Sequence, residues 1–117
     1  MIIDVKPIIA AVVEFNNQWI KKHGTYDFGS CGAAAIYITF GRKITLRKAL
    51  QAEGFIGADA WTMYGQKGYT VQPIRVENDL SIQNDCYFRE RGGVIATEVN
   101  KQLAETGAVA HCHSWVD

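Results

Sequence analysis

The chain has 117 residues, of which 48% are hydrophobic and 11% aromatic, and its 12 basic and 12 acidic residues give a formal net charge of zero. This length predicts one domain, and the hydrophobic content is sufficient for a core and argues against disorder. The balanced charge gives no global attraction to nucleic acid or to a membrane surface. Because nearly neutral copies repel one another weakly, we expect a homo-oligomer.

The cysteine count and the N-terminal residues predict an intracellular protein. The chain has three cysteines, Cys31, Cys86 and Cys112, and an odd number without a signal sequence is typical of reduced thiols. Its first residues lack a basic segment followed by a long apolar run, and no stretch approaches the roughly 18 apolar residues of a membrane span. We therefore expect a cytoplasmic location without membrane contact.

The first element predicted along the chain is an amphipathic helix of about four turns. Asp4 can cap its N-terminus, and Pro7 is tolerated in its first turn. Gly24 is suited to end it, after basic residues that favour a helix C-terminus. The apolar stripe consists of Ile8, Val12, Phe15 and Trp19.

Residues 33–40 are the strongest strand candidate, and we expect the rest of the chain to pack around them. Their side chains alternate between a small or amphipathic face and a wholly apolar face, the latter formed by Ala34, Ile36, Ile38 and Phe40. Because both faces look covered, we predict an inner strand of a sheet. The glycines at 29 and 32 precede it, so Cys31 stands where a turn enters the strand, either facing a cleft or buried as a small hydrophobe.

A short helix is predicted next, over residues 46–53. Thr45 suits its N-cap, and Gly54 stops it. The one local basic cluster lies here, and it is either a solvated helix face or a contact for phosphate or an acidic partner. The cluster consists of Arg42, Lys43, Arg47 and Lys48.

The middle of the chain predicts a β-hairpin. Residues 58–64 and 69–72 have strand character, and residues 65–68 form the glycine-bounded turn between them. We expect the strand face that carries Trp61 and Met63 to point into the core.

A long helix should follow, from about residue 77 to residue 106, and then a final strand over residues 108–117. Gly92 and Gly93 each cost roughly 1 kcal/mol relative to alanine in a helix. Either the helix breaks there or the glycines let it approach the sheet, and we expect close packing opposite residues 33–35. The last strand is expected beside the central one.

The resulting order α-β-α-β-β-α-β predicts an α+β fold. We expect a single-domain sandwich, with a mainly antiparallel sheet of about four strands and helices packed largely on one face.

Three short motifs recur in this order in a known group of proteins. The motifs are Ser30-Cys31-Gly32-Ala33 at the strand start, Arg91-Gly92-Gly93 in the last helix, and the terminal Ser114-Trp115-Val116-Asp117. The chain, from about Asp27 onward, resembles short uncharacterised proteins of tailed bacteriophages and prophages with a Ser-Cys-Gly-small strand and a terminal Ser-x-x-Asp. The resemblance implies expression in the cytoplasm of an infected bacterium, and it implies no activity.

A metal site is one kind of catalytic centre that the sequence allows. His111 and His113 would share one strand face about 6–7 Å apart, which suits chelation, and Cys31 and Cys86 could join them. However, Cys112 would point the opposite way, and the sequence has no Cys-x-x-Cys or His-Glu-x-x-His motif. We therefore expect no metal and no cofactor.

A cysteine nucleophile is the second kind. Cys31 would need a histidine base, with Asp27 or Asp59 to orient it. No catalytic signature surrounds these residues.

A binding pocket without chemistry is the third possibility. The turn over residues 26–32 and the C-terminal residues 114–117 would lie near each other if the outer strands pair. Aromatic side chains could then stack on a ligand and polar ones could contact it, although the same aromatics could instead fill the core or its rim. The expected ligand-binding residues are Tyr26, Asp27, Ser30, Cys31, Tyr64, Tyr69, Ser114, Trp115 and Asp117.

From these observations we predict a non-enzymatic phage accessory protein. It would bind a host protein or a small nucleotide-like ligand, and interference with host defence is a role that fits such a protein. The alternatives are a small cysteine- or metal-dependent hydrolase and a nucleic-acid-binding protein that uses the basic cluster.

Overall fold

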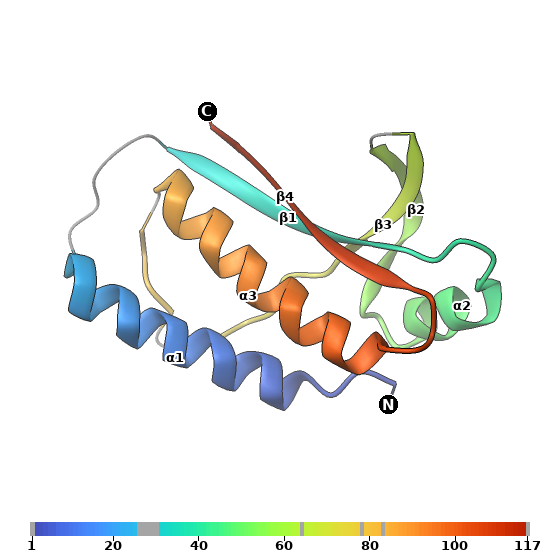
Figure 1. The fold of residues 1–117 in the computed structure, drawn as a ribbon, viewed down its shortest axis with the longest axis horizontal. Helices are drawn as coiled ribbons and strands as arrows, with labels where there is room; N and C mark the ends of the chain where they lie inside the picture. Colours follow the sequence, from blue (N-terminus) through green and yellow to red (C-terminus); the bar gives the residue numbers. More distant parts are fainter. Residues whose placement is uncertain (1, 26–30, 64, 78, 83, 117) are drawn as a thin grey trace.

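The computed structural model describes residues 2–25, 31–63, 65–77, 79–82 and 84–116. In these residues the elements follow the predicted order, and the α+β prediction is confirmed (Figure 1). The elements are α1 (Val5–His23), β1 (Gly32–Thr39), α2 (Ile44–Ala52), β2 (Ile56–Met63), β3 (Gln66–Val71), α3 (Asp85–Leu103) and β4 (Val109–Val116).

The four strands form one antiparallel sheet in the order β2-β3-β1-β4, so β1 is an inner strand, as predicted. β1 pairs with β4 without interruption, from Gly32 opposite Val116 to Thr39 opposite Val109. This confirms that the last strand lies beside the central one. By contrast, only Tyr37 and Ile38 of β1 pair with β3.

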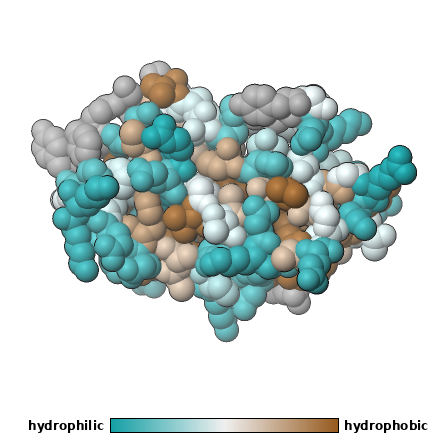
Figure 2. Space-filling view, in the orientation of Figure 1, coloured by the Kyte–Doolittle hydropathy of each residue, from teal (hydrophilic) through white to brown (hydrophobic). Residues whose placement is uncertain are grey.

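Helices α1 and α3 run side by side along one face of the sheet (Figure 1). The core lies between them and the sheet, where Ile8, Val12, Ile38, Val99 and Leu103 are almost completely buried. In the space-filling view of the same side, apolar residues appear as separate patches among hydrophilic ones (Figure 2). None of the helices in the described part of the chain combines the length and apolar character that a bilayer crossing requires.

No described helix covers the other face of the sheet, so the expectation that both faces of β1 are covered is wrong in this respect. Tyr37, which lies on this helix-free face, is nevertheless only 6% exposed. Its ring lies over Gly68, where a Cβ atom would stand 2.4 Å from the Tyr37 Cδ2, and it stacks on His111 with the ring centroids 5.0 Å apart. Tyr37 is therefore buried by the His111 ring on β4 and by its contact with Gly68, which has no side chain, and not by a helix.

The hairpin differs from its prediction. Met63 pairs with Gln66, so the turn is shorter than the predicted residues 65–68. Trp61 lies opposite Gly68 on the helix-free face and is 47% exposed, so the prediction that it points into the core is wrong. The reason is the alternation of β3, which directs the buried Tyr69 towards the helices and therefore Gly68 away from them.

The first helix begins as predicted, because the Asp4 Oδ1 accepts a hydrogen bond from the Lys6 N–H at 3.0 Å. Helix α2 begins at Ile44, and Lys43 precedes it without a side-chain cap, so the Thr45 cap is wrong.

The last helix is shorter than predicted at both ends. It begins at Asp85, after Asn84, whose Oδ1 accepts from the Tyr87 N–H at 3.1 Å, and it ends at Leu103. It runs unbroken through the two glycines, and Gly92 lies against β1 and β4, which confirms the predicted close packing.

Candidate functional site

A cavity of about 430 Å³ opens where β3 leaves β1. After Ile38 and Tyr37, the same register would place Val71 opposite Ile36 and Pro73 opposite Ala34. Proline has no N–H to donate, so the ladder cannot continue through that position. The segment after β3 instead stays beside the start of β2, where the Gln72 N–H donates to the Phe55 carbonyl at 2.9 Å. The cavity is therefore a gap in the sheet with a defined cause.

The peptide groups of Ala34 face this gap. The Ala110 N–H donates to the Asn100 Oδ1 at 2.7 Å, so it points away from β1. In an antiparallel pair the residue opposite, Ile38, then also directs its N–H and C=O away from β4, towards β3. Ala34 has the same phase as Ile38, and none of the described residues pairs with it on that side. The N–H and C=O of Ala34 are therefore directed at the cavity, and Ile36, which has the same phase and also lines the cavity, directs its N–H and C=O to the same side.

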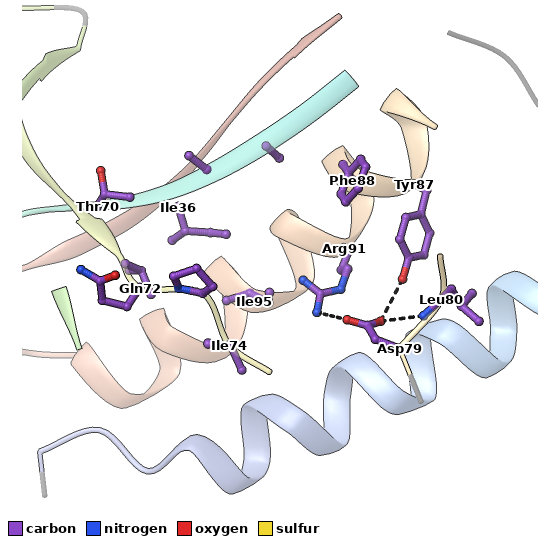
Figure 3. Close-up of a pocket in the computed structure, with 14 residues that line it drawn as sticks. Ile36, Thr70, Gln72, Ile74, Asp79, Leu80, Tyr87, Phe88, Arg91 and Ile95 are labelled. Carbon is purple, nitrogen blue, oxygen red and sulfur yellow. Dashed lines mark hydrogen bonds and ion pairs between the residues drawn. The ribbon is translucent and has the colours of Figure 1, made fainter. Parts of the chain in front are cut away.

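Arg91 of α3 supplies the cationic group of the cavity. Its guanidinium forms an ion pair with the Asp79 carboxylate, and its side chain is 16% exposed. Asp79 also accepts from the Asn16 Nδ2 at 2.7 Å. A third donor is the Leu80 N–H at 3.1 Å (Figure 3). Asp79 thus holds the Arg91 guanidinium through Nη2, one of the three nitrogen atoms that carry its five N–H groups.

Tyr87 completes the polar cluster. Its hydroxyl lies 2.6 Å from the Asn16 Oδ1 and 3.1 Å from the Asp79 Oδ1, and its single proton can be donated to only one of them at a time. Burial, together with the negative charge of Asp79, raises the pKa of Tyr87 to about 12. Tyr87 is therefore a neutral donor at physiological pH.

The charge of Asp79 is set by opposing effects. Burial acts to raise its pKa, but hydrogen bonds from Asn16, Arg91 and Tyr87 and the positive charge of Arg91 together hold that pKa below its usual value. Asp79 and Arg91 thus form an ionised pair with no net charge.

The walls of the cavity are mainly apolar and come from both layers of the fold. Figure 3 shows Ile36 on the sheet and Phe88 and Ile95 on α3. The described lining residues include no cysteine and no histidine. An apolar space with a few converging polar groups is suited to holding a small ligand. Its remaining apolar lining consists of Ala35, Val71, Pro73, Ile74 and Leu80.

The pocket predicted from the sequence is brought together only in part. Gly32 pairs with Val116 and Ala33 with Trp115, so the start of β1 and the C-terminal residues lie side by side, as expected. Cys31 is exposed at that end and forms an isolated antiparallel bridge with Asn84, whereas Ser114 and Trp115 pair with Ala34 and Ala33. Five of the predicted residues lie outside the described part of the chain: Tyr26, Asp27, Ser30, Tyr64 and Asp117.

Tyr69 lies elsewhere. It pairs with Ile38, six residues along β1 from Gly32, and it is buried on the helix-covered face. Arg47 donates to its hydroxyl at 2.9 Å and stands 5.2 Å from its ring centroid. Arg47 thereby has a structural contact, whereas the other members of the basic cluster, Arg42, Lys43 and Lys48, are exposed.

The catalytic alternatives gain no support from the geometry. His113 lies opposite Ala35, four residues along β1 from Cys31, a separation of about 13 Å by strand rise. Cys112 points towards α3, away from the histidines, as the alternation predicted, and burial raises its pKa. Among the described residues, no group of three or more His, Cys, Asp or Glu side chains could hold a metal ion.

Comparisons with known proteins add no relative: no family model, no curated protein and no solved structure matches this chain.

The sequence reasoning missed the residues that define the cavity. Asp79 lies in a loop and Arg91 lies in α3. The periodicity of apolar residues in the sequence does not determine how this loop and this helix are placed relative to each other. One signal was present, because Asn16 falls on the apolar stripe of α1 between Val12 and Trp19 and is 5% exposed. A buried amide needs hydrogen-bonding partners, so Asn16 indicated a polar contact at this face of α1.

Proposed function

We propose that this chain is a non-enzymatic binding protein that holds a small nucleotide-like ligand in the cavity beside Arg91. The observation that carries this proposal is the convergence of the Ala34 peptide groups and the Arg91 guanidinium on one apolar space. The proposal refines the ligand to a flat heterocycle such as a nucleobase.

The hydrogen-bonding groups fit the edge of a nucleobase. Ala34 offers one donor and one acceptor on the same edge of β1, and a nucleobase presents acceptors and donors side by side on its own edge. Phe88 and Ile36 offer apolar surfaces against which a flat ring can pack. Ring and peptide edge together would fix the ligand's orientation in the gap between β1 and β3.

The charge balance favours the ring over the phosphate as the source of affinity. Asp79 neutralises Arg91, so a free anion would gain little attraction and would also be repelled by the Asp79 carboxylate. We therefore expect nucleosides to bind nearly as well as their monophosphates, and inorganic phosphate not to bind.

The setting that we propose is the cytoplasm of an infected bacterium. The resemblance to phage and prophage proteins supports a phage accessory role. Withholding a nucleotide-like molecule from a host pathway is one way in which a small binding protein could counter host defence.

Isothermal titration calorimetry with the common nucleosides, their 5′-monophosphates and inorganic phosphate tests this proposal. We expect at least one nucleoside to bind, and Arg91→Gln to weaken its binding about tenfold, since a hydrogen bond to a charged group contributes roughly 1.5–3 kcal/mol. Arg89→Gln, an exposed position on the same helix, is the matched control and should bind as the unmodified chain does. Ile74→Trp, which enlarges an apolar lining residue so that it fills the cavity, should abolish binding. Absence of binding by every nucleoside would contradict the proposal.

A host protein is the second candidate partner, and one observation favours it. On the helix-free face, β1 and β4 carry no lysine, arginine or carboxylate, while Trp61 and Trp115 are 47% and 40% exposed. Exposed aromatic side chains on an uncharged surface are typical of protein interfaces. In this case, Trp61→Ala should release a bound host protein without changing nucleoside affinity.

A further inference from the structure

The outer edge of β4 lacks the features by which proteins usually protect an edge strand. β4 is the last strand of the sheet, and among the described elements it contacts only β1 and α3. Residues 109–116 include no lysine, proline or carboxylate, and their pairing with β1 has no bulge. The opposite edge, β2, has a register irregularity between Ile56 and Ala60. Charges, prolines and bulges are the common protections of an edge, so β4 is the edge open to pairing.

One end of this edge is already occupied by a side chain that imitates a neighbouring strand. The Asn100 Nδ2 donates to the Ala110 carbonyl at 2.9 Å, and the Asn100 Oδ1 accepts from the Ala110 N–H at 2.7 Å. By the alternation of an antiparallel strand, Cys112, Ser114 and Val116 direct their N–H and C=O groups outward in the same way. Pairing with another strand is therefore blocked at Ala110 and open beyond it.

We propose that two copies of this chain associate through the open part of β4, antiparallel about a two-fold axis at Ser114. In this register, Ser114 pairs with Ser114 of the second copy, and Cys112 pairs with Val116. Two-fold axes at Cys112 or His113 would instead place Ser114 or Val116 opposite Ala110, whose groups are bound to Asn100. The axis at Ser114 is the register that pairs all three open residues and leaves Asn100 in place.

The side chains complement each other in this register. On the helix-free face, His113 of one copy would lie opposite Trp115 of the other, and these two ring types already contact within one chain at 5.7 Å. Pairing would cover Trp115 and Val116, which are 40% and 59% exposed. Residues 109–116 contain no lysine, arginine or carboxylate, so pairing two copies brings no like charges together in this segment. The formal net charge of the chain is also zero. Cross-strand aromatic pairs stabilise such contacts, and like charges would oppose them.

The expected interface is small. Five residues of each strand pair, which buries less than the roughly 1,200 Å² of a stable complex. The dimer should therefore be weak and dependent on concentration, and it would join two four-stranded sheets into one continuous sheet.

Sedimentation velocity of the full chain over a wide concentration range tests the association. We expect a monomer–dimer equilibrium for the unmodified chain and a monomer at every concentration for Ser114→Pro, which removes the outward N–H at the axis. Thr62→Pro removes an outward N–H from the other edge and should leave the equilibrium unchanged. If Ser114→Pro does not fold, Val116→Lys places a charge at an exposed position of the same edge and should also give a monomer. An unmodified chain that remains monomeric, or a folded variant of this edge that dimerises normally, would overturn the proposal.

Cross-linking tests the register. A residue on the two-fold axis forms a hydrogen-bonded pair with the same residue of the second copy. The two Cα atoms of such a pair are about 5.5 Å apart, within the range that a disulfide spans. With the three native cysteines replaced by alanine, Ser114→Cys should oxidise to a covalent dimer, whereas Thr62→Cys should not. Equal cross-linking of both variants would refute the register.

Discussion

A Cβ atom on Gly92 would stand 2.5 Å from the Sγ of Cys112, so α3 approaches β4 more closely than any residue other than glycine allows. The same atom would stand 3.4 Å from the Ala34 Cβ. Helix α3 therefore lies over β1 and β4 at a distance set by one absent side chain. This approach also brings Arg91, the preceding residue, to the cavity.

Gly92→Ala should destabilise the fold. The added methyl group must displace Cys112 or the helix, and such overpacking costs about 1–3 kcal/mol. Gly93→Ala is the matched control, because a Cβ atom there meets no other atom within 4 Å, and it should stabilise the helix by up to roughly 1 kcal/mol. Urea unfolding of both variants measures the difference. Equal free energies of unfolding for the two would show that α3 does not approach β4 closely.

The hydroxyl of Tyr87 should make stability fall at high pH. Its pKa is about 12 in the folded chain and 10.0 ordinarily, so the unfolded chain loses this proton first. The contribution is therefore fully present below pH 10.0, decreases as the pH rises to about 12, and is constant above that. Tyr87→Phe should cost about 1–3 kcal/mol at neutral pH, because Asn16 and Asp79 lose a buried donor. In denaturant unfolding across this range, the difference between the two proteins should shrink, and a constant difference would contradict the assignment.

Asp79 should contribute to stability in the opposite part of the pH range. Its pKa is lowered from 3.8 in the folded chain, so its contribution is present above pH 3.8 and is lost as the pH falls through the folded value. Asp79→Asn should destabilise the chain at neutral pH and weaken its sensitivity to acid. Glu77→Gln, an exposed carboxylate two residues earlier, is the control. An acid unfolding midpoint that Asp79→Asn leaves unchanged would show that Asp79 is not linked to folding.

The thiols of Cys31 and Cys112 should differ in reactivity. Cys31 is exposed, whereas Cys112 is partly buried against α3, and burial raises its pKa. Because the thiolate is the reactive form, iodoacetamide at pH 8 should alkylate Cys31 first. Mass spectrometry of the digested protein gives the alkylation rate of each thiol. Equal rates for Cys31 and Cys112 in the folded protein would contradict the placement of Cys112.

The layers, the hairpin and the place of the last strand beside the central one could be predicted from the sequence, whereas the pairing of β1 with β3 was not predicted. The alternation of residues 33–40 and the stripe of α1 each identify a buried face, and a strand after a long helix readily returns beside the first one. Trp61 could not be placed in this way, because a hairpin with apolar residues on one face gives no sign of which face the helices take. The register, set by Met63 opposite Gln66, decided it.

The cavity could not be predicted, because it depends on the end of a ladder and on contacts between distant residues. Pro73 was a visible break in strand character, but the residue left opposite it, Ala34, depends on the pairing of β1 with β3. The contact of Asn16 with Asp79 spans 63 residues and follows from the packing of α1. Local sequence patterns do not contain either relationship.

Hydrogen exchange at Ala34, measured by NMR, tests the central claim most directly. If its peptide groups face an open gap and hold the ligand, the Ala34 amide should exchange much faster than the paired Ile38 amide in the free protein. A nucleoside that binds should then slow exchange at Ala34 and leave Ile38 unchanged. An Ala34 amide as protected as Ile38 in the free protein, or one that a bound nucleoside does not slow, would contradict the account.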